Sequence, residues 1–256
     1  MDAERFSERV VMVTGGASGI GAATVRRFAG EGAAVVAVCD TNLALAEEIA
    51  AGLAPAHGVA YRLDVTDLAG TETVVADLTE RFGSVDVLVS AAGVDRCDTV
   101  PNTSPEEWRT IMSVDLDGVY HSCRAVLPGM VERGRGAIVT ISSAIGTVGE
   151  RQRSAYCAAK AGVENLTRAM ALDHGRDGVR ANCVAPGLID TPLIRGGKVG
   201  GDEDPNAMQA MVDRHHALGR IGRADEVAAA ITFLASDDAS FITGVVLAVD
   251  AGWNAQ

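Results

Sequence analysis

Short apolar runs alternate with segments of helical period along the whole chain. The runs predict strands at residues 10–13, 34–39, 59–63, 86–89, 137–141, 179–185 and 245–249. Helical patterns follow the first run and recur at residues 42–53, 67–81, 104–133 and 225–235, with a further helix around Tyr156. Strand and helix alternate about seven times. This alternation predicts an α/β fold: a Rossmann-like, doubly wound parallel sheet of about seven strands with helices on both faces.

One stretch interrupts the alternation. Residues 192–206 are rich in glycine and aspartate and have no clear period. Such a segment between two regular elements predicts a mobile lid over a substrate, within a substrate-loop insertion at about residues 190–217. No repeat or linker divides the chain, so we expect one nucleotide-binding domain over residues 1–256.

The composition supports a buried sheet and limits the partners. Apolar residues make up 48% of the chain and aromatic residues only 4%, so Val, Ile, Leu and Ala must build the core, as in parallel strands buried on both faces. The formal net charge, 22 − 34 = −12, argues against nucleic acid or an anionic membrane as a partner. The scattered cysteines, the lack of a signal peptide and the lack of an 18-residue apolar run predict a cytoplasmic protein with reduced thiols. We find no metal-ligand spacing and expect no metal site.

A glycine-rich turn follows the first strand, with glycines 15, 19 and 21 in a G-x-x-x-G-x-G spacing. A strand, a glycine turn and a helix together present backbone N–H groups and a helix N-terminus to a phosphate. A tight strand-to-helix turn without a ligand is the alternative. The expected cofactor contacts in this turn are Gly15, Ser18, Gly19, Ile20 and Gly21.

Asp40 ends the second strand, nineteen residues beyond Gly21. A carboxylate there can accept hydrogen bonds from an adenosine ribose, and it would repel a 2′-phosphate. Residues 35–61 contain no Arg or Lys to neutralise such a phosphate. The sequence therefore predicts NAD rather than NADP. Asp40 could in addition cap the helix that starts near Asn42.

The fifth strand ends in two serines, and Tyr156 and Lys160 follow on the next helix. An i,i+4 spacing places the two side chains on one face of that helix. A free phenol has a pKa of about 10, and a nearby ammonium lowers it. Ser143 could hold a carbonyl oxygen while Tyr156 moves the proton. The motif alone also fits an ordinary half-exposed helix turn.

The other candidate residues fall at predicted strand ends as well. Ligands of doubly wound sheets bind outside the carboxyl ends of the strands. The small residues Ala92 and Gly93 would let a flat ligand approach the backbone closely. Besides the glycine turn and Asp40, the strand-end positions include Asp64, Gly93, Ser143, Pro186 and Gly187.

Taken together, these motifs make the chain resemble the short-chain dehydrogenase/reductase family from Arg9 to Trp253. The resemblance implies that Tyr156 transfers the proton, Ser143 holds the substrate oxygen, and Lys160 binds the nicotinamide ribose and lowers the tyrosine pKa. It also implies an adenine contact at Asp64 and Val65, a carboxamide contact at Thr191 with the backbone of Ile189 nearby, and a homotetramer.

The chain departs from the family pattern at two places. Ser90-Ala91-Ala92-Gly93 stands where the family usually has Asn-Asn-Ala-Gly, and Asp115 stands where it has a fourth catalytic residue, Asn. An ionised Asp115 accepts hydrogen bonds but cannot donate them. An added anion near Tyr156 would raise the tyrosine pKa. We therefore predict retained activity with an alkaline pH optimum.

The substrate is less clearly encoded. The expected pocket draws on residues 94–98 and 145–153, Leu188 and the lid, with Leu193, Ile194, Met208 and Met211 as apolar candidates. Arg151, Arg153 and Arg195 could meet a carboxylate of a substrate, but we expect them to be solvated surface, and we expect the pair His215-His216 on a polar helix face. The favoured function is an NAD-dependent dehydrogenase of a secondary alcohol, cyclic or a polyol. The alternatives are a 3-oxoacyl-type ketoreductase, which Asp40 and the negative charge disfavour, and a catalytically idle dinucleotide-binding protein.

Overall fold

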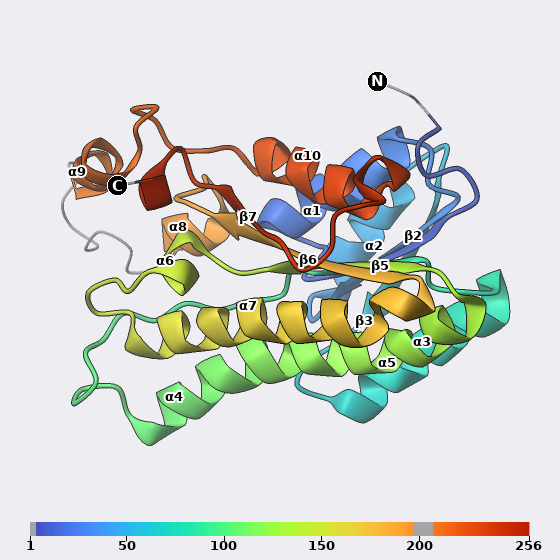
Figure 1. Cartoon of the computed structure of the whole chain (residues 1–256), viewed down its shortest axis with the longest axis horizontal. Helices are drawn as coiled ribbons and strands as arrows, with labels where there is room; N and C mark the ends of the chain where they lie inside the picture. Colours follow the sequence, from blue (N-terminus) through green and yellow to red (C-terminus); the bar gives the residue numbers. More distant parts are fainter. Residues whose placement is uncertain (1–3, 197–206, 256) are drawn as a thin grey trace.

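The computed structural model describes residues 4–196 and 207–255. Its centre is one seven-stranded sheet in the order β3-β2-β1-β4-β5-β6-β7, and every neighbouring pair of strands is parallel (Figure 1). The strands are β1 (Val10–Thr14), β2 (Val35–Asp40), β3 (His57–Arg62), β4 (Val87–Ser90), β5 (Gly136–Ile141), β6 (Val179–Pro186) and β7 (Val246–Val249). The predicted doubly wound sheet is confirmed.

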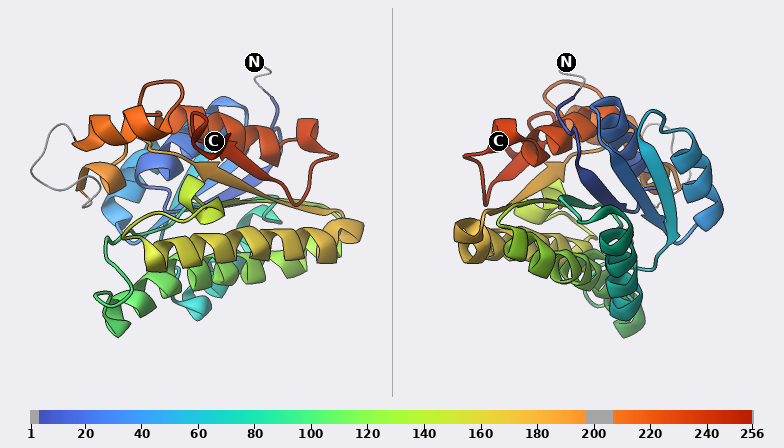
Figure 2. Two further views of the ribbon diagram at one scale, coloured as in Figure 1. Left: turned by 60° about the vertical axis from the view of Figure 1, so that its left-hand side comes forward. Right: turned by 90° about the vertical axis from the view of Figure 1, so that its right-hand side faces the viewer.

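Helices cover both faces of the sheet (Figure 2). One face carries α1 (Gly19–Gly30), α2 (Leu43–Ala51) and α10 (Ala224–Ala235), and the other carries α3 (Leu68–Phe82), α5 (Gly118–Arg133) and α7 (Ser154–His174). Successive residues of β1 point to opposite faces, so Val11 and Val13 join the first core and Met12 joins the second. All three are fully buried, which explains why the strand is a continuous apolar run.

The strand order creates the crevice that holds the site. From β1 the chain builds outward to β2 and β3, and then returns to the other side of β1 with β4. The connections after β1 and β4 therefore diverge, and an opening is left between them at the carboxyl ends of the strands.

The expected helix at residues 104–133 is continuous but not uniform. It consists of α4 (Pro105–Met112), one π-helical turn (Ser113–Asp117) and α5. Ser104 and Glu107 form a capping box at its start. The π-helical turn carries Asp115 and buries it completely. A widened turn of this kind frequently marks a functional position.

The expected substrate loop contains two short helices, α8 (Pro192–Gly196) and α9 (Ala207–His215). Most of the predicted lid, residues 197–206, lies outside the described residues. Asp250 stabilises the turn after β7, where its carboxylate accepts hydrogen bonds from the backbone N–H groups of Gly252 and Asn254. The remaining elements are α6 (Ala144–Thr147) and three 3₁₀ turns at Gly175–Asp177, Asp237–Ala239 and Trp253–Ala255.

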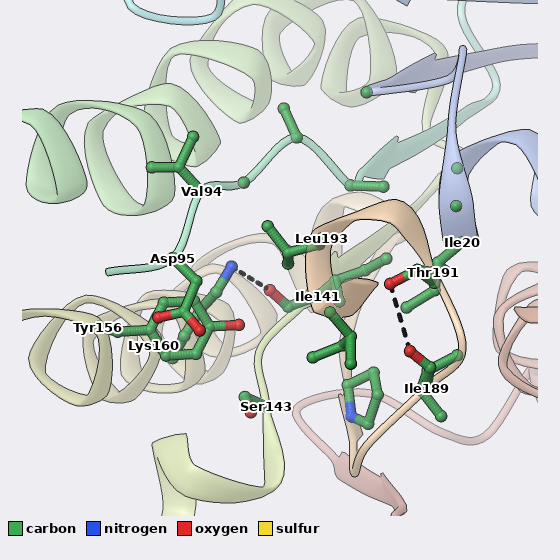
Figure 3. Close-up of a pocket in the computed structure, with 18 of the residues that line it drawn as sticks. Ile20, Val94, Asp95, Ile141, Ser143, Tyr156, Lys160, Ile189, Thr191 and Leu193 are labelled. Carbon is green, nitrogen blue, oxygen red and sulfur yellow. Dashed lines mark hydrogen bonds between the residues drawn. The ribbon is translucent and has the colours of Figure 1, made fainter. Parts of the chain in front are cut away.

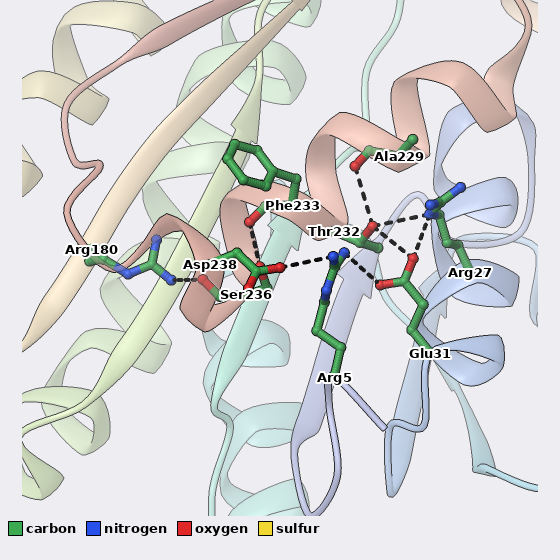
Figure 4. Close-up of polar contacts among 9 residues, drawn as sticks. All are labelled: Arg5, Arg27, Glu31, Arg180, Ala229, Thr232, Phe233, Ser236 and Asp238. Carbon is green, nitrogen blue, oxygen red and sulfur yellow. Dashed lines mark hydrogen bonds and ion pairs between the residues drawn. The ribbon is translucent and has the colours of Figure 1, made fainter. Parts of the chain in front are cut away.

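A polar network ties the beginning of the chain to α1 and α10, at the end of the sheet away from the crevice (Figure 4). The buried carboxylate of Glu31 binds Arg5 at 3.2 Å and Arg27 at 2.7 Å, and it accepts a hydrogen bond from Thr232. Arg5 also pairs with Asp238 at 2.8 Å. These contacts satisfy a buried charge, as folding requires.

Candidate active site

A cavity of about 430 Å³ opens at the carboxyl ends of the strands (Figure 3). It extends from the glycine turn after β1 to the start of α7. Residues that the sequence analysis proposed, although far apart in the chain, meet here: Gly15, Ser18, Gly19, Ile20, Gly21, Asp40, Asp64, Val65, Ala92, Gly93, Ser143, Tyr156, Lys160, Pro186, Gly187, Ile189 and Thr191 all line this cavity. Asp115 does not line it and lies behind Lys160.

The glycine turn fits a phosphate cradle. Gly15 has a left-handed φ of +64°, and a Cβ atom there would lie 2.7 Å from the backbone of Ala92. A Cβ on Gly21 would collide with the carbonyl oxygen of Gly15. Ser18 begins α1 without a side-chain cap, so the first N–H groups of the helix remain available for an anion. The close backbone packing and the open helix start together match a dinucleotide pyrophosphate.

The Asp40 carboxylate is held at the cavity by two backbone donors. Its Oδ2 accepts from the N–H of Ala17 at 3.1 Å, and its Oδ1 accepts from the N–H of Asn42 at 3.0 Å. Asn42, not Asp40, caps α2 by accepting from Leu45 N. Asp40 therefore links the glycine turn to the end of β2 and is not used as the cap that the sequence allowed.

Ser143, Tyr156 and Lys160 lie on one wall of the cavity (Figure 3). Lys160 Nζ lies 5.4 Å from the centre of the Tyr156 ring and donates to the carbonyl of Ile141 at 3.2 Å. Ser143 follows β5 and caps α6, where its Oγ accepts a long hydrogen bond of 3.4 Å from Ile145 N. The end of β5 and the first turns of α7 thus bring a hydroxyl, a phenol and an ammonium together.

The carboxylate of Asp115 lies directly behind this group. Its Oδ1 accepts from Val94 N at 2.9 Å and lies 3.6 Å from Lys160 Nζ. Burial raises the pKa of Asp115, and the nearby ammonium of Lys160 opposes that rise. For Lys160, burial lowers the pKa, but Asp115 and Tyr156 outweigh burial and leave the pKa raised. The ion pair keeps Lys160 charged.

The protonation of Tyr156 differs from the simple expectation that a lysine makes it acidic. The pKa of Tyr156 is raised to about 12: burial is the main cause, Asp115 and Asp95 add to the rise, and Lys160 and the Ser143 hydroxyl oppose it. The expected contribution of Asp115 has the predicted sign. The contribution of Asp95 is an addition that the sequence analysis did not identify.

Two predictions about polar surface residues are wrong. Arg153 is buried and pairs with Asp95, whose carboxylate oxygen lies 3.5 Å from Arg153 Nε. His216 is also buried: its Nε2 accepts from Leu188 N at 3.2 Å, so its Nδ1 donates to the carbonyl of Arg220. Arg195, as expected, is exposed and pairs with Asp190. Local sequence gave no sign that tertiary contacts would bury Arg153 and His216.

His215 and Glu150 add a further pair beside the cavity. The imidazole of His215 stacks on the indole of Trp253 with a centroid distance of 4.1 Å, and its Nε2 lies 3.7 Å from Glu150. Burial lowers the pKa of His215. Glu150 and Trp253 both line the cavity.

Another residue that the sequence analysis missed supports the strand end. Glu164, one turn after Lys160, is buried and accepts hydrogen bonds from the hydroxyls of Ser142 and Thr147, both at 2.9 Å. Ser142 Oγ also lies 3.1 Å from the carbonyl oxygen of Lys160, so its one proton is shared between the two acceptors. The i,i+4 spacing of Lys160, Glu164 and Arg168 was the available signal.

Within residues 4–196 and 207–255, no group of three or more His, Cys, Asp or Glu side chains could hold a metal ion. No helix in the same ranges is long and apolar enough to span a bilayer.

Known proteins are similar to this chain over nearly its whole length. A family model described as Enoyl-(Acyl carrier protein) reductase matches residues 15–254. Meso-2,3-butanediol dehydrogenase of Serratia marcescens is 41% identical over 98% of this chain and 97% of its own length. Cis-4-hydroxycyclohexanecarboxylate dehydrogenase of Sinomonas cyclohexanicum is 43% identical over 98% of this chain and 99% of its own.

A reductase and a protein of known structure are also similar to this chain over nearly its full length. The 3-oxoacyl-(acyl-carrier-protein) reductase FabG of Thermotoga maritima is 37% identical over 97% of this chain and 98% of its own length. The crystal structure of gox2181 is 36% identical and superimposes with a TM-score of 0.92, covering 100% of both chains. With these full-length relatives and its site geometry, the chain belongs to the short-chain dehydrogenase/reductase family of nicotinamide-dependent oxidoreductases.

Proposed function

We propose that this protein is an NAD-dependent oxidoreductase that interconverts a secondary alcohol and a ketone, with Tyr156 as the general acid and base. The observation that carries the proposal is the single cavity in which Ser143, Tyr156 and Lys160 face the same space as the glycine turn and Asp40. A nicotinamide ring held there would accept or supply the hydride. The protein's own groups position the alcohol and move the proton.

Each side chain of the group has a distinct part in alcohol oxidation. The Ser143 hydroxyl holds the substrate oxygen, and the Tyr156 phenolate takes the hydroxyl proton as the carbinol hydrogen leaves as hydride. The Lys160 ammonium lowers the tyrosine pKa and is itself fixed by Ile141 and Asp115. Alignment of these groups before reaction contributes to the rate acceleration.

The preference for NAD rests on Asp40. Its carboxylate stands at the cavity, where a ribose hydroxyl could donate to it and a 2′-phosphate would be repelled. Among the described residues that line the cavity, the Lys and Arg side chains are Lys160 and Arg153, at the opposite end. Arg62 is in register with Asp40 on β3 but is not among the lining residues.

A 3-oxoacyl-type ketoreductase is the second candidate, and the Thermotoga relative favours it. That activity would call for NADPH and for a basic surface that docks an acidic carrier protein. Asp40 and the formal net charge of −12 favour the alcohol dehydrogenase instead. An idle dinucleotide-binding protein is disfavoured by the assembled Ser143, Tyr156 and Lys160.

Replacement of Tyr156 by Phe tests the proposed chemistry. The variant keeps the ring but loses the proton-transferring hydroxyl, so we expect oxidation of secondary alcohols with NAD to fall by about 10²–10⁴-fold. The measurement is the rate of NADH formation, and NADH binding is followed in parallel by fluorescence titration. Tyr120→Phe removes a hydroxyl from an exposed tyrosine on α5 and serves as the matched control.

The binding titration distinguishes a loss of cofactor binding from a loss of the chemical step. A Tyr156→Phe protein that binds NADH normally but does not turn over supports the assignment. A Tyr156→Phe protein with the wild-type oxidation rate would remove Tyr156 from the mechanism, and a wild-type protein that oxidises no alcohol would favour the idle alternative.

A further inference from the structure

The proton-transferring group has a buried ion pair beside it, formed by Asp95 and Arg153. Asp95 lies in the connection after β4, and Arg153 immediately precedes α7. Each side chain is only 9% exposed, and Arg153 Nε lies 3.5 Å from Asp95 Oδ2. A parallel bridge between Asp98 and Arg153 joins the two backbone segments. The pair is therefore a fixed part of the cavity wall rather than a mobile surface contact.

The pair is incompletely satisfied. Asp95 Oδ1 and Arg153 Nη1 are both buried, and neither has a hydrogen-bond partner among the residues that the structure describes. Buried polar atoms are normally hydrogen-bonded because leaving them unpaired is costly. Both side chains line the cavity, so a small shift of either one would let a polar group of a ligand reach these unpaired atoms.

The pair lies close to the reacting groups. Arg153 precedes Tyr156 by three residues, at the start of the same helix. Asp95 follows Val94, whose N–H binds Asp115. Asp95 also acts electrostatically on both Tyr156 and Lys160, and Figure 3 shows its carboxylate beside their side chains. A polar group bound at the pair would therefore belong to the substrate and lie near its reacting carbon.

The chemistry of the pair selects among polar groups. A hydroxyl donates one hydrogen bond and accepts others, so it offers both the donor that Asp95 Oδ1 lacks and the acceptor that Arg153 Nη1 lacks. A carboxylate can only accept, and it would meet the negative charges of Asp95 and Glu150 in the same cavity. An unsubstituted alkyl chain would leave both polar atoms unpaired.

We propose that Asp95 and Arg153 form a subsite for a second hydroxyl group of the substrate, so that the enzyme prefers diols or polyols over simple alcohols and hydroxy acids. This inference rests on the proposed function and adds the substrate class. The other side chains around this end of the cavity are mainly apolar and suit a short carbon chain or ring: Ile145, Leu188, Ile194, Met211 and Trp253.

A matched series of alcohols tests the subsite in the wild-type enzyme with NAD. Butane-2,3-diol carries the second hydroxyl, butan-2-ol lacks it, and 3-hydroxybutanoate replaces it with a carboxylate. We expect kcat/KM for the diol to exceed that for butan-2-ol by about tenfold or more, with the hydroxy acid slower than either.

The two side chains are then removed. Asp95→Asn, Arg153→Met and the double variant should each bring the diol-to-butanol ratio of kcat/KM close to one. The double variant removes both charges together and avoids leaving one buried charge unpaired, so it keeps the test valid if a single variant folds poorly. Arg151→Met, which changes an exposed arginine two residues away, should leave the ratio at its wild-type value.

A binding measurement removes the contribution of turnover. With NADH bound, the diol cannot be oxidised, and tryptophan fluorescence reports its dissociation constant because Trp253 lines the cavity. The double variant should weaken this binding by about tenfold or more. A hydroxy acid preferred by the wild type and lost in Arg153→Met would overturn the proposal in favour of a carboxylate site.

The diol-to-butanol ratio also shows whether the pair binds substrate or is only structural. A wild-type diol-to-butanol ratio close to one, or a ratio that the double variant does not change, would show that the pair is structural. In either case the alcohols would still be oxidised, so the proposed function would stand. Only the absence of oxidation with every alcohol would contradict the proposed function itself.

Discussion

Asp115 is the residue in which this chain departs most from its family pattern, and the structure shows what the departure changes. Its fully buried carboxylate accepts from Val94 N and lies 3.6 Å from Lys160 Nζ. It raises the pKa of Lys160 and contributes to the raised pKa of Tyr156. One buried anion thus favours the charged lysine and disfavours the phenolate.

The Asp115→Asn variant tests this electrostatic role. In the proposed mechanism, alcohol oxidation needs the Tyr156 phenolate, and the raised pKa of about 12 places this form on the alkaline side. Because Asp115 raises that pKa, its neutralisation should move the alkaline midpoint of the kcat/KM–pH profile to lower pH. Asp117→Asn, an exposed acid in the same π-helical turn, is the control and should leave the profile in place. An unmoved midpoint in Asp115→Asn would refute the assignment.

At the scale of single residues, the sequence predicted which residues form the site, but it did not predict which polar side chains are buried. Ser143, Tyr156 and Lys160 could be selected from spacing because strand ends and i,i+4 positions have fixed geometry. Arg153 could not be recognised as buried because its partner, Asp95, comes from a loop more than fifty residues away. His216 was missed because its contact with Leu188, 28 residues earlier in the chain, forms only in the folded protein.

The conformation of the turn between β1 and α1 depends on close contacts between backbone segments. Gly21 packs against the carbonyl of Gly15, and Gly15 packs against the backbone of Ala92 at the end of β4. The spacing of the glycines predicted a phosphate-binding turn. The contact with β4 could not be predicted from the spacing, because it depends on the strand order β2-β1-β4.

Gly21→Ala tests the turn against a control on the same helix. The added methyl group would collide with backbone, so we expect weaker NADH binding and a loss of about 1–3 kcal/mol in the free energy of unfolding. Gly30, the last residue of α1, has nothing within 4 Å of a built Cβ, so Gly30→Ala should bind NADH normally. Fluorescence titration and chemical unfolding measure the two effects. Equal behaviour of the two variants would contradict the close-packed turn.

For the molecule as a whole, the apolar pattern was sufficient to predict one doubly wound parallel sheet, since strands buried on both faces have a distinctive composition. The π-helical turn inside the helix at residues 104–133 was not predictable, because helical periodicity does not distinguish one widened turn. The homotetramer implied by the family stays a prediction, which light scattering can check. Exposed apolar side chains such as Trp108, Phe233 and Phe241 are candidates for subunit contacts.

The central claim, that this enzyme oxidises alcohols with NAD, is tested most directly by comparing the two cofactors with one alcohol. The measurement is kcat/KM for NAD and for NADP at a fixed, saturating concentration of a secondary alcohol at alkaline pH. Since Asp40 should repel a 2′-phosphate, we expect NAD to be favoured by about tenfold or more. Equal or better use of NADP would contradict the assignment of Asp40 and favour the ketoreductase.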